Sequence, residues 1–247
     1  MSEWQLLAVA ATGTIAGGLS NRCIDRLPSG QPLFFRRDPC PLCGRADGIL
    51  RATLSALSIL GPNASLRCSR CRTTWRPTQS VVAALMPIVW MALALRHGFQ
   101  PRSAALVVFV TSLIILAVID YEHYLLPDVL TLPMTGAGVA ATAIPGWPIT
   151  LMESCLSAAA GYFGMMALAK VAEQYYGEEA LGQGDWKMVA MIGAYFGSTK
   201  MMLVLVGANA AGAVIGLGLI ALRGAEGRQK LPLGSFLGLT ALLVAFL

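Results

Sequence analysis

The chain has 247 residues, of which 56% are hydrophobic and only 13% are charged, and its mean hydropathy is +0.65. This composition excludes an ordinary soluble domain and predicts an all-α polytopic membrane protein. The net charge of +5 does not indicate a nucleic-acid partner, because basic residues also gather on the cytoplasmic side of membrane proteins.

Apolar runs that are long enough, or nearly long enough, to cross a bilayer recur along the whole chain. They predict about eight transmembrane helices, over residues 4–20, 80–96, 103–119, 129–145, 149–170, 186–198, 200–222 and 232–247. The fourth run contains Pro133 and the sixth is short, but such features are tolerated where neighbouring helices satisfy the backbone. We predict three parts: a first helix (1–20), a small cytoplasmic loop domain (21–79) and a polytopic membrane domain (80–247).

The distribution of basic residues predicts the orientation of these helices. No basic residue precedes the first apolar run, which argues against a secretory signal, whereas arginines crowd the loop after it. The positive-inside rule therefore places the N-terminus outside and the loop 21–79 in the cytoplasm. With eight crossings, only Arg96, Arg102 and Lys200 fall on the outer side. The chain is expected to be a multi-pass protein in contact with the lipid bilayer.

The loop 21–79 carries two Cys-x-x-Cys pairs, which are Cys40 with Cys43 and Cys68 with Cys71. Each pair can direct two thiolates at one ion, so the spacing predicts a structural zinc site with four cysteine ligands. A disulfide pair would need an oxidising compartment, which the predicted cytoplasmic location disfavours. A DNA-binding zinc ribbon is the other alternative, but the positive-inside rule already accounts for the arginines.

Two acids lie at the ends of apolar runs, where a charge is costly to keep without a use. Asp120 follows the third run, and Asp185 precedes the core of the sixth. Gly182 and Gly184 come just before Asp185 and would let backbone or substrate approach it closely. Two crossings separate the acids, so both are expected on the cytoplasmic face. Taken singly, Asp120 could be a helix-end charge and Asp185 an N-cap.

The polar residues near these acids allow several interpretations. Asp128 follows a proline and is predicted to cap the fourth segment. Lys187 could steady a carboxylate or contact lipid headgroups, and the sequence does not choose between the two. Glu122 and His123 could supply protons or be interfacial polar residues. Glu153 lies near the outer end of the fifth segment and is expected to be peripheral.

Two carboxylates held close together cannot both be ionised cheaply, so the pair is expected to share one proton. The ionised member can take a proton from water while the protonated member polarises a carbonyl group. An ion- or proton-coupled transporter with Asp120 and Asp185 as relay acids is the main alternative, but relay sites lie nearer the midplane. A zinc scaffold with a membrane anchor would leave eight crossings unexplained.

On these residues the sequence resembles the type IV prepilin peptidases, which are GxGD-class membrane aspartyl proteases. Asp120 is followed eight residues later by the acid of Leu126-Pro127-Asp128, and Gly182-x-Gly184-Asp185-x-Lys187 forms the second motif. Further similarity lies in Asn21, Arg26-Leu27-Pro28, both cysteine pairs and Leu231-Pro232-Leu233-Gly234-Ser235-Phe236.

The resemblance implies that Asp120 and Asp185 are the catalytic pair, with Gly182, Gly184 and Lys187 as supporting residues. It implies that the substrate is the basic N-terminal leader of a type IV prepilin or a type II secretion pseudopilin. Cleavage would take place at the cytoplasmic face of the bacterial inner membrane.

Many members of this family also methylate the new N-terminus with S-adenosylmethionine. Here residues 44–67 contain no Glu, so the usual Glu-x-x-Pro region is missing, and Thr74-Trp75-Arg76-Pro77 replaces an Arg-Tyr-Pro. Gly18-Leu19-Ser20 likewise replaces a Gly-Ser-Phe. These departures leave the methyltransferase activity open, and with it S-adenosylmethionine as a cofactor.

Overall fold

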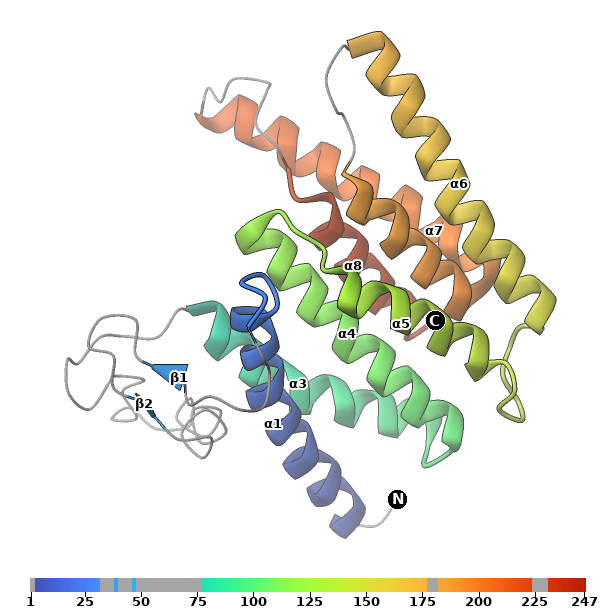
Figure 1. Ribbon diagram of the computed structural model, residues 1–247. Coiled ribbons are helices and arrows are strands. Elements are labelled where there is room, and N and C mark those ends of the chain that lie inside the picture. The colour runs from blue at the N-terminus through green and yellow to red at the C-terminus, as the bar shows by residue number, and fades with distance from the viewer. Residues whose placement is uncertain (1–2, 32–37, 40–45, 48–76, 177–181, 224–230) are drawn as a thin grey trace. The chain divides into compact units, whose positions relative to one another are not determined.

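A computed structural model of the chain describes residues 3–31, 38–39, 46–47, 77–176, 182–223 and 231–247. The chain divides into two compact units, Met1–Ser103 and Ala104–Leu247. The described ranges contain seven helices and one short antiparallel pair of strands, β1 (Asp38–Pro39) and β2 (Ala46–Asp47) (Figure 1). The predicted helical architecture is therefore confirmed for the part of the chain that the structure describes.

The first unit contains two packed helices, α1 (Glu3–Arg26) and α3 (Pro77–His97). They approach closely because glycine lies at the contact: a Cβ on Gly13 would be 2.7 Å from the Cα of Pro87. Near the other end of α1, the side-chain amide of Asn21 donates a hydrogen bond to the carbonyl oxygen of Gln79 at 2.9 Å. Close packing at small residues and this hydrogen bond thus hold α1 against α3.

The second unit contains α4 (Pro101–His123), α5 (Asp128–Ala141), α6 (Leu151–Tyr176), α7 (Gln183–Arg223) and α8 (Leu233–Val244). Helix α7 is its centre and packs against α5, α6 and α8. The hydroxyl of Ser154 on α6 donates to the carbonyl oxygen of Ala194 on α7 at 2.7 Å. The ring of Phe109 on α4 stacks on Tyr195 of α7, with centroids 4.0 Å apart. The core of this unit therefore forms around the first part of α7.

Helix α7 is broken at Gly197, whose backbone angles (φ 76°, ψ 177°) are not helical. Eight residues of continuous helix would span about 12 Å. Yet a Cβ on Gly193 would be only 2.8 Å from the sulfur of Met201, so the chain reverses between them. In Figure 1 the second part of α7 runs back behind the first. The two parts correspond to the predicted segments 186–198 and 200–222.

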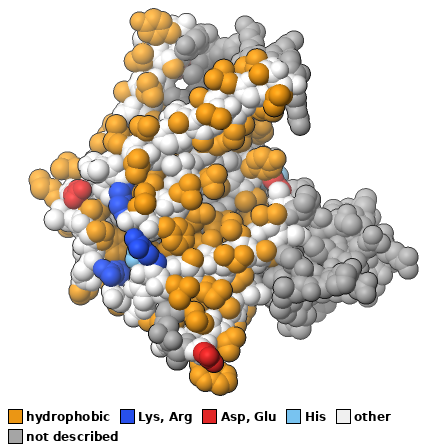
Figure 2. Space-filling model, turned by 180° about the vertical axis from the view of Figure 1, so that it is seen from behind, with side chains coloured by type: hydrophobic (Ala, Val, Ile, Leu, Met, Phe, Trp, Pro, Cys, Tyr) orange, Lys and Arg blue, Asp and Glu red, His pale blue; other side chains and the backbone are white. Residues whose placement is uncertain are grey.

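Four of the described helical spans are long and apolar enough to cross a membrane: Thr78–His97, Pro101–His123, Leu151–Tyr175 and Gln183–Leu222. Hydrophobic side chains dominate the described surface in Figure 2, as expected for a membrane protein. Helices α5 and α8 have 14 and 12 residues. They are about 21 and 18 Å long, which is less than the ~30 Å of a hydrocarbon core. The structure therefore supports a polytopic membrane protein, whereas the number of eight crossings stays a prediction.

The predicted zinc ligands Cys40, Cys43, Cys68 and Cys71 all lie outside the described residues, so the zinc site stays a prediction. The same holds for the cytoplasmic loop domain 21–79, of which only a few residues after α1 are described.

Candidate active site

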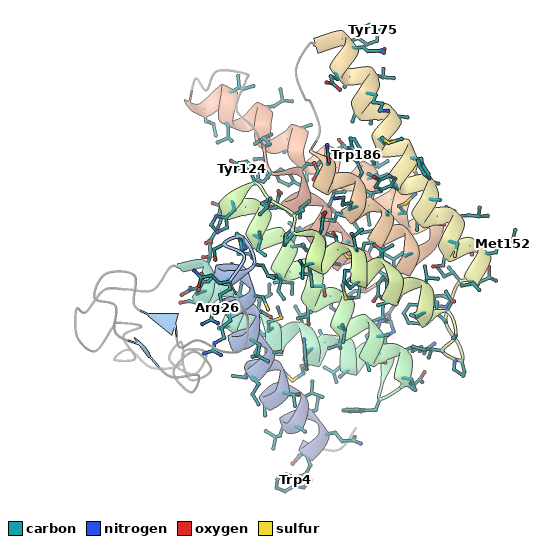
Figure 3. The ribbon with its side chains drawn as sticks, in the orientation of Figure 1. Trp4, Arg26, Tyr124, Met152, Tyr175 and Trp186 are labelled. Carbon is teal, nitrogen blue, oxygen red and sulfur yellow. The ribbon has the colours of Figure 1, made fainter. Side chains whose placement is uncertain are left out.

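Asp120 and Asp185 come from different helices and meet in the second unit. Asp120 lies near the C-terminal end of α4, and Asp185 lies in the first turn of α7. Both are buried, with 6% and 9% of their surface exposed, and they are close enough to interact electrostatically. In Figure 3, Tyr124 near Asp120 and Trp186 beside Asp185 lie toward one end of this unit, whereas Met152 at the start of α6 lies away from it.

The carboxylate of Asp120 is held by the first turn of α8. The backbone N–H of Ser235 donates to Oδ2 of Asp120 at 2.8 Å. The hydroxyl of Ser235 donates to the carbonyl oxygen of Ala117 at 2.8 Å and lies 3.3 Å from the same Oδ2. The first N–H groups of a helix have no partner inside the helix, so they are available to an anion. In the sequence Ser235 stands out only through the resemblance, because no local pattern indicates a contact with an acid 115 residues away.

Positions 234 and 184 require glycine, because the residues around the two acids leave no room there for a side chain. A Cβ on Gly234 would be 2.9 Å from both Cγ and Oδ2 of Asp120 and 3.0 Å from Cδ1 of Leu126. A Cβ on Gly184 would be 2.7 Å from Cβ of Leu126. The space that Gly184 provides is thus filled by a side chain of the protein, whereas the sequence had indicated an approach of backbone or substrate.

Asp185 does not occupy the N-cap position that was one alternative for it. Helix α7 begins at Gln183, and the backbone N–H of Asp185 donates to the carbonyl oxygen of Gly182 at 3.1 Å. A Cβ on Gly182 would only reach ordinary contact with Oδ2 of Asp185, at 3.5 Å. Asp185 is therefore a residue of the first turn of α7. A side chain would fit more easily at position 182 than at position 184.

The capping prediction for Asp128 is wrong. The N-cap of α5 is Pro127, which is extended (φ −70°, ψ 128°), and no side chain caps the helix. The carboxylate of Asp128 instead binds Lys187, whose Nζ lies 2.6 and 2.7 Å from its two oxygens. This ion pair also settles the role of Lys187 in favour of steadying a carboxylate. A tertiary contact from another helix decided both roles, and no local sequence pattern indicates it.

The remaining polar residues lie apart from this pairing. His123 is 3.8 Å from Glu122, as suits two polar residues at a helix end. Glu153 lies at the bend of α7, where its Oε1 would be 2.6 Å from a Cβ on Gly197. Asp185 is at the opposite end of that helical segment, so the peripheral position predicted for Glu153 agrees with the structure.

The arrangement is suited to acid–base chemistry on water. Two buried carboxylates that interact can share a proton, and each has a neighbouring group that restricts it: the α8 turn for Asp120 and helix α7 for Asp185. Within the described ranges, no group of three or more His, Cys, Asp or Glu side chains could hold a metal ion.

Comparison with known proteins places these residues in a family. The pattern of the type IV leader peptidase family matches residues 107–217, which include both acids. A prepilin leader peptidase/N-methyltransferase of Aeromonas salmonicida (strain A449) is 31% identical over 212 residues, which cover 84% of this chain and 70% of the relative.

Proteins of the same name give similar matches. The one from Burkholderia pseudomallei (strain 1026b) is 33% identical over 226 residues, covering 86% of this chain and 68% of the relative. The one from Pseudomonas aeruginosa is 26% identical over 259 residues, covering 95% and 87%. No solved structure matches the chain significantly. By this similarity over most of its length, the chain belongs to the type IV leader peptidase family.

Proposed function

We propose that this chain is a membrane aspartyl endopeptidase that removes the basic N-terminal leader from type IV prepilins or pseudopilins. The observation that carries the proposal is the buried, interacting pair of Asp120 and Asp185, inside the range that matches the family. The names of the relatives support the substrate. Family membership gives no support to the alternative of an ion- or proton-coupled transporter.

The proposed reaction uses water as the nucleophile. The ionised carboxylate takes a proton from a water molecule, whose oxygen bonds to the scissile carbonyl carbon, while the protonated carboxyl group gives its proton to the carbonyl oxygen. The tetrahedral intermediate then collapses: the C–N bond breaks as the acid that took the proton from water gives it to the leaving nitrogen. The other carboxylate takes the proton of one hydroxyl group of the intermediate, so the pair again shares one proton. Neither acid forms a covalent bond to the substrate.

We propose that this site faces the cytoplasm at the bacterial inner membrane. The excess of arginine in the loop 21–79 supports that orientation, and the two crossings predicted between the acids would keep them on one face. Water would enter from the cytoplasm, and the hydrophobic helix of the prepilin would approach through the bilayer. A basic leader followed by an apolar helix would obey the same positive-inside rule.

The test is cleavage of a prepilin with a basic leader by the reconstituted protein and its Asp120→Asn and Asp185→Asn variants. Asn keeps the size of the side chain but cannot titrate, so each variant should lose roughly 10³-fold or more in rate. Glu153→Gln is the matched control. It neutralises an acid of α6 that lies beside Gly197, at the end of the first part of α7 opposite to Asp185. Near-normal cleavage by either Asn variant would show that its acid is structural.

Methylation of the new N-terminus is the second activity in the names of the relatives. Residues 44–67 contain no Glu, so the Glu-x-x-Pro region is missing from this chain. We therefore propose the peptidase activity alone and assign no residue to methyl transfer. The mass of the processed N-terminus, measured with and without S-adenosylmethionine, decides whether a methyl group is added.

We further propose that Cys40, Cys43, Cys68 and Cys71 bind one structural zinc ion, a proposal that rests on their spacing. Metal analysis of the purified wild type and of a Cys40→Ser/Cys68→Ser variant tests it. The wild type should hold one zinc per chain, and the variant should hold little. Equal zinc in both would contradict the proposal.

A further inference from the structure

We propose that the ion pair between Lys187 and Asp128 is a positioning device for the two acids. It holds the turn between α4 and α5 against the start of α7, and in this way it sets how Asp120 and Asp185 face each other. The inference rests on the proposed function and adds Lys187 and Asp128 to it as positioning residues.

The turn is tied first to the helix that carries Asp120. The backbone N–H of Tyr124 donates to the carbonyl oxygen of Asp120 at 2.9 Å and ends α4. Tyr124 has a φ of 52°, in the left-handed region that a tyrosine seldom adopts. Strain of this kind persists only where surrounding contacts hold the chain in place. The path of the turn is therefore imposed by its contacts.

The second contact is the side chain of Leu126, in the middle of the turn. Leu126 is buried, with 8% of its surface exposed, and it lies between the backbones of Gly184 and Gly234. Gly184 immediately precedes Asp185, and Gly234 touches the carboxylate of Asp120. A displacement of Leu126 would therefore be felt at both acids, because close-packed groups transmit small shifts.

The third contact is the ion pair, which joins the start of α5 to the start of α7. Nζ of Lys187 binds both oxygens of Asp128, and the two side chains are 20% and 53% exposed. Lys187 is two residues after Asp185, and residues two apart on a helix do not face each other. The ammonium group of Lys187 is thus directed to the turn. Its two short hydrogen bonds to the carboxylate favour one defined position of Asp128 relative to α7.

Cleavage kinetics of the full chain test the inference. Lys187→Met and Asp128→Asn should each lower kcat by about 10- to 100-fold with little change in KM, because misplacement by about 1 Å acts on the chemical step. Lys187→Arg should keep most of the activity, since a guanidinium also binds a carboxylate through two bonds. Lys170→Met, which removes an exposed lysine of α6, is the matched control.

The charge-reversed variant, Lys187→Asp with Asp128→Lys, separates positioning from a general loss of stability. It keeps the combined length and the opposite charges of the pair, so it should recover at least several-fold over the worse single variant. If it is no more active than that variant while Lys187→Arg is also inactive, the positioning role is wrong. Wild-type rates in both neutral variants would overturn it equally.

The contact itself can be measured without any cleavage. Acylation of Lys187 by acetic anhydride, followed by mass spectrometry, should be several-fold faster in Asp128→Asn than in the wild type, because the two short bonds to Asp128 hold Nζ against the carboxylate and hinder its access to the reagent. An unchanged rate would remove the ion pair on which the inference depends. If the wild type cleaves no prepilin although Lys187 is protected, the proposed function fails and the contact stands.

Discussion

At the scale of single residues, the candidate site depends on backbone that comes within contact distance of a carboxylate. Gly234 lies in the first turn of α8, and any side chain there would meet Asp120 and Leu126 at about the same distance, 2.9 to 3.0 Å. The same turn supplies the N–H of Ser235 to Asp120. Position 234 therefore controls both the orientation of the carboxylate and the approach of α8.

Gly234→Ala is predicted to lower the cleavage rate by about 10- to 100-fold, because the added methyl group must displace the carboxylate of Asp120. Cleavage of a prepilin by the purified variant measures the effect, and thermal unfolding checks that it is folded. Gly164→Ala is the matched control, since no atom lies within 4 Å of a Cβ at that position. Wild-type activity in Gly234→Ala would show that Asp120 tolerates movement.

At the scale of the element, the fold of the second unit depends on the reversal in α7. Gly197 has a φ of 76° and a ψ of 177°, a combination that is essentially restricted to glycine. The reversal brings Met201 back against Gly193, and both parts of α7 then contribute to the packing. Without it, the core around Tyr195 would lose the second half of its central helix.

Gly197→Ala is predicted to destabilise the protein by about 1–3 kcal/mol, from strained backbone angles and from contact with Glu153. Thermal unfolding in detergent measures this as a lower Tm, with Gly218→Ala, at an open position in the second part of α7, as control. Gly197→Ala/Glu153→Ala removes the steric contact and should recover only part of the loss. Full recovery would show that the backbone angles are not the cause.

At the scale of the whole molecule, the remaining question is the orientation in the membrane. In the proposed orientation both acids lie on the side of the loop 21–79, and in Figure 3 Tyr124, Tyr175 and Trp186 lie toward the same end of the second unit. The ends of α4 and α6 and the start of α7 are thus on one side, as the order of crossings requires.

Fusion of alkaline phosphatase, which is active only after export, is predicted to give active enzyme after residues 98 and 146 and inactive enzyme after residues 76 and 178. The reason is that residues 98 and 146 lie on the outer side in the proposed topology, whereas residues 76 and 178 lie on the cytoplasmic side. A green fluorescent protein fused at the same sites should show the opposite pattern. Active phosphatase after residue 178 would place the two acids outside the cytoplasm.

Much of this architecture could be read from local patterns. Each of the eight apolar segments corresponds to a helix or to one part of α7 in the described residues, because burying apolar side chains and satisfying backbone groups in lipid both require a helix. The number of crossings could not be read in the same way. Helices α5 and α8 are apolar but short, so their composition does not say whether they span.

Asp120, Asp185 and Gly184 could be chosen as site residues from the sequence, because an acid at the end of an apolar run is costly to keep without a use and Gly184 directly precedes one of the two acids. Their neighbours could not be chosen in this way. The contacts of Ser235 with Asp120, of Lys187 with Asp128 and of Leu126 with two glycines each join distant segments. Packing between helices decided those contacts, and packing depends on shape and distance in three dimensions, which composition and spacing do not contain.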